Sequence, residues 1–79
     1  FPNPFNPETN ISFSIPAGGF VSLEIFNPAG IEIASLAGKN FNPGNYSVKW
    51  NGDNYSSGVY FYRLSVNGFV QTKKMILLK

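Results

Sequence analysis

The sequence offers few side chains that could carry out acid–base or nucleophilic chemistry. Its 79 residues include no histidine and no cysteine, so the commonest general base and the strongest nucleophile are both missing. Glu24 and Glu32 lie on either side of a turn at Asn27 and could face each other like the paired acids of a glycosidase. Both, however, occupy solvent-facing positions of predicted strands, where acidic side chains are ordinarily just hydrated. We therefore expect neither an enzyme nor a cofactor.

Two other groups could bind a ligand. Segment 51–58 (NGDNYSSG) carries oxygen ligands at alternate positions, as a calcium loop does, but it has one carboxylate and no closing glutamate. We interpret it as a polar hairpin loop and expect no metal. Trp50, Tyr55 and Tyr60 could form an aromatic platform for a carbohydrate, although Trp50 alternates with polar neighbours and is expected to point inward.

A basic pair stands before the apolar end of the sequence. Lys73 and Lys74 precede four apolar residues, a combination that could anchor a helix to a membrane surface. The β-strand interpretation fits better, and in a strand the two lysines point to opposite faces. Met75 and Leu77 then oppose Ile76 and Leu78. Because both faces are apolar, we expect this strand to be buried on both sides or to form an edge that needs a partner.

Composition narrows the possible partners and the domain organisation. The net charge of +2 comes from few, dispersed charges, so the basic patch of a nucleic-acid binder is missing. No apolar stretch reaches the roughly 18 residues of a membrane span, and the first residues do not form a secretory signal. The chain reads as a single domain, residues 1–79, cut from a longer secreted protein. Its many aromatic side chains are expected to replace disulfides in stabilising the core.

Apolar residues alternate with polar ones between frequent turn signals, and this pattern predicts an all-β sandwich or barrel. An Asn-Gly pair at 67–68 predicts a type I′ hairpin that joins the last two strands. Segments 27–30 (NPAG) and 42–45 (NPGN) predict type I and type II turns, respectively. The predicted strands cover residues 11–15, 21–26, 31–36, 46–50, 58–66 and 69–78.

Five segments in a fixed order carry a resemblance to a known family. Together they span essentially the whole chain, and the chain resembles the type A C-terminal sorting domain of the type IX secretion system. The resemblance implies an Ig-like antiparallel β-sandwich of about seven strands, related to a domain of flagellar hook-capping proteins. It also implies a secretion signal without catalytic activity. The segments are FPNPFNPET, NPAGIEIASL, PGNYSVKW, SGVYFYRL and KKMILLK.

The same resemblance implies partners and a location. An outer-membrane translocon would export an upstream cargo, and a sortase-like peptidase would remove the domain and attach the cargo to an anionic glycolipid. The cargo would then be secreted or held at the outer surface of a Gram-negative cell. By motif match, the recognition residues would be Gly58, Tyr60, Lys73, Lys74, Met75, Ile76, Leu77, Leu78 and Lys79.

A function of another class stays open at this point. A β-sandwich with an apolar edge strand could instead be a structural subunit, which assembles with copies of itself into an extracellular filament through edge-strand pairing. Concentration-dependent fibres would favour the filament, and a persistent monomer would favour the secretion signal.

Overall fold

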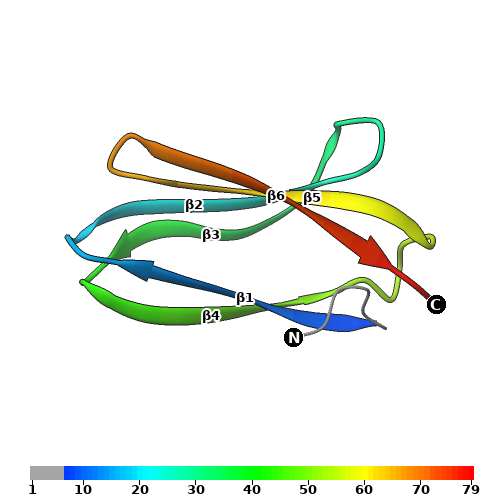
Figure 1. Cartoon of the computed structure of the whole chain (residues 1–79), viewed down its shortest axis with the longest axis horizontal. Coiled ribbons are helices and arrows are strands. Elements are labelled where there is room, and N and C mark those ends of the chain that lie inside the picture. The colour runs from blue at the N-terminus through cyan, green and yellow to red at the C-terminus, as the bar shows by residue number, and fades with distance from the viewer. Residues whose placement is uncertain (1–6) are drawn as a thin grey trace.

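The protein is an all-β molecule. The computed structural model describes residues 7–79, and no helix in this part of the chain is long and apolar enough to cross a membrane. Six strands follow one another along the chain (Figure 1). They are β1 (Glu8–Ile15), β2 (Gly19–Phe26), β3 (Glu32–Phe41), β4 (Gly44–Asn51), β5 (Gly58–Val66) and β6 (Phe69–Leu77).

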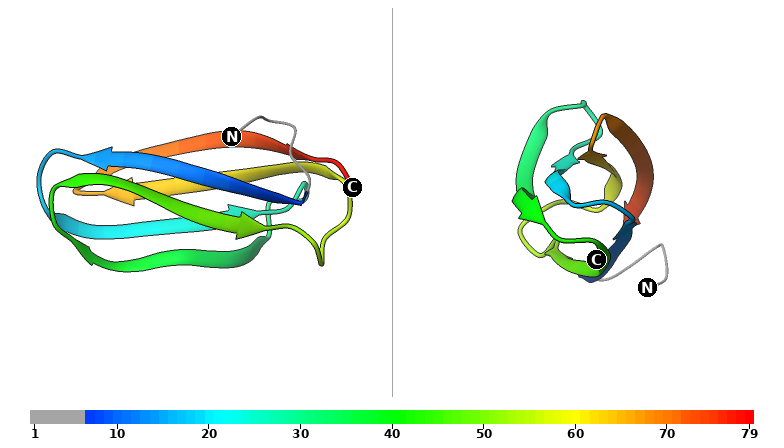
Figure 2. Two further views of the ribbon diagram at one scale, coloured as in Figure 1. Left: turned by 90° about the horizontal axis from the view of Figure 1, so that it is seen from below. Right: turned by 90° about the vertical axis from the view of Figure 1, so that its left-hand side faces the viewer.

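The strands form two antiparallel sheets. One sheet has the order β3-β2-β5-β6, and the other pairs β1 with β4. The smaller sheet lies against one face of the larger one (Figure 2). This arrangement confirms the predicted all-β, antiparallel fold. A seventh strand is not found within residues 7–79, and the Ig-like topology stays a prediction.

The core is built by alternate residues of each strand, as the period-two pattern predicted. In β2, Val21, Leu23 and Ile25 are fully buried while the residues between them are more exposed. Successive strand residues point to opposite faces, so one face of each sheet is apolar and the two apolar faces pack together. The other buried apolar residues are Ile11, Phe13, Ile15, Trp50, Tyr60, Leu64, Met75 and Leu77.

Aromatic rings pack in two groups at opposite ends of the small sheet. Phe13, Phe41 and Tyr46 form one group, with ring centroids 4.7 to 5.8 Å apart. Trp50, Tyr55 and Tyr60 form the other, with centroids 5.5 to 6.3 Å apart. Aromatic pairs at such separations stabilise a core beyond the area that they bury. A chain without cysteine thus packs both ends of its sandwich with rings.

The hairpin between β5 and β6 matches its prediction. Asn67 and Gly68 both have positive φ, at 50° and 79°, which is the signature of a type I′ turn. The turn fixes the pairing of the two strands, from Val66 opposite Phe69 to Gly58 opposite Leu77.

Of the two other predicted turns, one is found as predicted and one has a different backbone geometry. The turn at 27–30 closes as expected, because the Gly30 amide donates to the Asn27 carbonyl at 2.9 Å. The turn at 42–45 is more open than type II, since Gly44 has a φ of 151° rather than about 80°.

The third strand is longer than predicted. It was expected to end at residue 36 but continues to Phe41, because Lys39, Asn40 and Phe41 pair with the beginning of β2. The exposed Gly-Lys-Asn stretch resembles a loop in sequence, yet the neighbouring strand supplies hydrogen bonds that keep it extended.

Candidate recognition surface

The structure divides the predicted recognition residues between two faces of the large sheet. Tyr60, Met75 and Leu77 point into the core and are at most 5% exposed. In the folded domain they pack against the small sheet and have almost no surface left for a partner. Their structural role is to hold the last strand in place.

The alternate residues of the tail, which we define as residues 73–79, face outward. Lys74 and Ile76 lie on the side of the large sheet that the small sheet does not cover, and Leu78, directly after β6, is half exposed. Ile76 is partly buried. The prediction that both faces of the tail are apolar is therefore correct, but only one of the two faces is in the core.

Two residues of β5 extend this outward face, and they are not among the predicted recognition residues. Val59 lies opposite Ile76, and Phe61 lies opposite Lys74. Counting back along both strands from the Asn-Gly turn would have identified these pairs. We call Val59, Phe61, Lys74, Ile76 and Leu78 the outer surface. It presents apolar side chains around one ammonium group.

A second cation lies beside the outer surface. The Arg63 guanidinium is 3.5 Å from a Glu24 carboxylate oxygen and 4.8 Å from the centroid of the Phe26 ring. The opposition of Glu24 and Glu32, which was considered from the sequence but not expected, is not found, because Glu24 pairs with Ser35 and Glu32 with Phe26 across β2 and β3. Glu24 and Glu32 are therefore not directly opposite each other, as the paired acids of a glycosidase would be.

Lys73 points to the opposite face of β6 from Lys74, as strand alternation predicted. It lies opposite Tyr62 and lines a hollow of about 280 Å³ between the edges of β1 and β6, next to Asn10. Within residues 7–79 it forms no ion pair.

Tyr62, the residue opposite Lys73, is partly buried. This burial raises the pKa of its phenol above its ordinary value of 10.0.

Gly58 lies beside the end of the tail, and Lys79 is the last residue of the tail. Gly58 begins β5 opposite Leu77. The amide of Lys79 donates to the Ser57 hydroxyl oxygen at 3.1 Å, and its ammonium donates to the backbone carbonyl of Asp53. The loop before β5 therefore contacts the last residue of the sequence.

The aromatic platform considered for carbohydrate is not on the surface. Trp50 and Tyr60 are 3% and 5% exposed. The Tyr55 hydroxyl donates to the Ile33 carbonyl at 3.2 Å, so this ring is also tied to the fold. The predicted inward position of Trp50 is confirmed. In the described residues, no three His, Cys, Asp or Glu side chains are grouped so that they could hold a metal ion.

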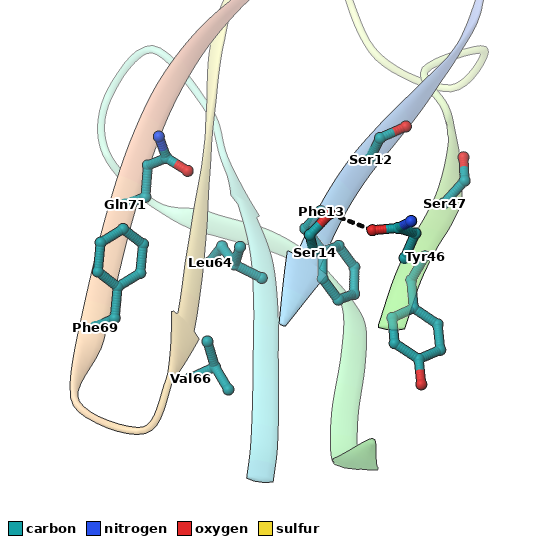
Figure 3. A pocket seen from close by; sticks show the side chains of 10 residues that line it. Ser12, Phe13, Ser14, Tyr46, Ser47, Leu64, Val66, Phe69 and Gln71 are labelled. Atoms are coloured by element: carbon teal, nitrogen blue, oxygen red, sulfur yellow. Dashed lines mark hydrogen bonds between the residues drawn. The ribbon is translucent and has the colours of Figure 1, made fainter. Parts of the chain in front are cut away.

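A large open cavity lies at the opposite end of the molecule from the tail. It has a volume of about 850 Å³ and lies between the small sheet and the β5–β6 hairpin (Figure 3). Its hydroxyl groups are not arranged with an acid or a base, because none of the ten lining residues is charged. The residues are Ser12, Phe13, Ser14, Asn45, Tyr46, Ser47, Leu64, Val66, Phe69 and Gln71.

Comparison with known proteins adds one finding. A family model described as "Secretion system C-terminal sorting domain" matches residues 1–78. No curated protein and no solved structure matches the chain. The matched residues include both strands that build the outer surface and all but the last residue of the tail.

Proposed function

Because the chain belongs to the family of secretion system C-terminal sorting domains, we propose that it directs an upstream cargo through the type IX system to the cell surface. The family is one of sorting signals and not of enzymes. The cargo would leave a Gram-negative cell through an outer-membrane translocon. A sortase-like peptidase would then attach it to the surface.

The observation that carries the proposal is the division of the tail between core and surface. Met75 and Leu77 anchor β6 in the core, and this anchoring places Ile76 on the outward side of the strand and leaves the next residue, Leu78, half exposed. A half-exposed leucine next to a partly buried isoleucine, at the end of an edge strand, is an apolar surface that a partner can cover. Recognition by the secretion machinery would supply that partner.

The chemistry of the outer surface indicates what such a partner would present. An apolar groove on the partner would fit the apolar side chains of this surface, which are Val59, Ile76 and Leu78. A carboxylate at the rim of that groove would interact favourably with the Lys74 ammonium. The motif residues Tyr60, Met75 and Leu77 would act indirectly, by keeping the strand in place, and the outward residues would make the contacts.

A fusion experiment tests the proposal. A reporter protein with a signal peptide is fused before residues 1–79 and produced in a bacterium that has the type IX system. We expect the complete fusion to reach the medium or the cell surface and a fusion that lacks residues 73–79 to remain in the periplasm. Unchanged export of the shortened fusion would overturn the proposal. Because the deletion also removes Leu77 from the core, point variants on the outward face are needed to separate recognition from folding.

A further inference from the structure

The loop that precedes β5, residues 52–57, holds the end of the tail through two polar contacts. The Lys79 amide donates to the Ser57 hydroxyl oxygen at 3.1 Å, and the Lys79 ammonium donates to the Asp53 carbonyl. Both contacts lie beyond Leu77, the last residue of β6. Lys79 is therefore held after the strand pairing has stopped.

The same loop fits closely around the last buried side chain. Gly52 is buried, and a β-carbon at this position would lie 2.9 Å from Leu77 Cδ2 and 3.1 Å from Leu77 Cδ1. The shorter of these distances is one that real β-carbons avoid, so a side chain at position 52 would require the end of the Leu77 side chain to shift. The glycine thus leaves the space that Leu77 occupies.

The loop is itself fixed by its own hydrogen bonds. The Tyr55 amide donates to the Gly52 carbonyl at 3.0 Å, and the Asp53 amide donates to the Asn51 side chain at 2.8 Å. The Tyr60 hydroxyl donates to the Ser56 carbonyl at 2.7 Å. These hydrogen bonds fix the conformation of the loop that contacts Leu77 and Lys79.

We infer that loop 52–57 is a docking element for the tail and that Ser57 and Gly52 are positioning residues for recognition. This inference rests on the proposed function. Held at Leu77 on one side and at Lys79 on the other, Leu78 has little freedom and keeps its side chain on the outer surface. A partner that binds a preformed surface avoids the entropy cost of ordering it. The secretion machinery would then read the tail as part of a folded surface and not as a free peptide.

Amide hydrogen exchange measured by NMR tests the docking itself. In Ser57→Ala, we expect the Lys79 amide to exchange about two- to tenfold faster, which corresponds to the usual net strength of one hydrogen bond. Ser57→Thr keeps a hydroxyl group and is expected to restore the slow rate. Ser56→Ala is the matched control, because Ser56 contributes a backbone carbonyl that the substitution retains. Equal Lys79 rates in all four proteins would overturn the inference.

Export of the reporter fusion tests the consequence for recognition. We expect Ser57→Ala to lower export about two- to tenfold, in step with the loss of tail order, while the midpoint of unfolding changes little. Ser57→Thr and Ser56→Ala should export like the parent. Faster Lys79 exchange with unchanged export would overturn the positioning role but leave the proposed function intact. The proposed function fails separately, if the fusion without residues 73–79 is still exported.

Discussion

At the scale of single residues, neighbours of the same type have opposite roles in this protein. Leu77 is fully buried, whereas Leu78 is half exposed. Leu77 stabilises the fold, and Leu78 is accessible to a binding partner. Composition alone cannot separate them, because the difference comes from strand alternation and from the sheet that covers one face.

The leucine pair gives a direct prediction of stability. Leu77→Ala removes a buried side chain beneath the 52–57 loop, and we expect it to lower the free energy of unfolding by about 2–5 kcal/mol. Leu78→Ala is the matched control and should change it by no more than about 0.5 kcal/mol. Chemical denaturation followed by tryptophan fluorescence measures both. Equal losses for the two variants would show that the strand register is wrong.

Tyr62 gives a prediction of pH dependence. Burial raises the pKa of its phenol above 10.0, so the folded state favours the neutral form. The stability that this contributes is complete below the pKa of the unfolded chain, about 10, and is lost as the pH rises through the folded-state pKa. A spectroscopic titration should show late tyrosine ionisation that is absent in Tyr62→Phe. If both proteins titrate alike, the phenol is not desolvated.

At the scale of elements, the β5–β6 hairpin sets the pairing of the tail. The sequence was sufficient to predict it, because an Asn-Gly turn allows one register. That register places Val59 beside Ile76 and Phe61 beside Lys74. Val59 and Phe61 lie within the SGVYFYRL segment but are not among the predicted recognition residues, because their position beside the tail depends on pairing across strands.

Other elements could not be predicted from local patterns. The end of β3 looked like a loop, since Gly38, Lys39 and Asn40 have low strand propensity, and only its pairing with β2 keeps it extended. The small sheet joins β1 and β4, which are far apart in the sequence. Such long-range pairing leaves no local signal, and it decides which face of the tail is covered.

The hairpin turn can be tested with two glycines. Gly68 has a φ of 79°, whereas Gly38 lies within β3 with open space around its Cα. We expect Gly68→Ala to lower the free energy of unfolding by about 1–2 kcal/mol, because a side chain is unfavourable in the left-handed region. Gly38→Ala should be close to neutral. Thermal unfolding of both variants measures the difference, and a neutral Gly68→Ala would contradict the type I′ turn.

At the scale of the whole molecule, two packed sheets leave strands with unpaired edges. Within residues 7–79, β3 and β6 are the edge strands of the larger sheet. Lysines on an edge strand oppose pairing with a second copy, because like charges are brought together, and β6 carries Lys73 and Lys74. This arrangement suits a domain that binds another protein better than one that assembles with itself.

The charged edge predicts the oligomeric state. Sedimentation velocity should show a monomer over a wide concentration range at physiological salt. Replacing Lys73 and Lys74 with serine removes the repulsion, so this double variant should associate more readily than the parent. Concentration-dependent fibres of the parent protein in electron microscopy would instead support a filament subunit.

The central claim, that the secretion machinery reads the outward face of a folded tail, is tested most directly by export of two matched variants. Ile76 and Val70 lie on the same outward row of β6, near opposite ends of the strand. We predict that Ile76→Ser combined with Leu78→Ser lowers export of the reporter at least about tenfold, the effect of roughly 1.4 kcal/mol of lost binding. Val70→Ser should export normally, and circular dichroism should show both proteins folded. Normal export of the folded double variant would contradict the claim.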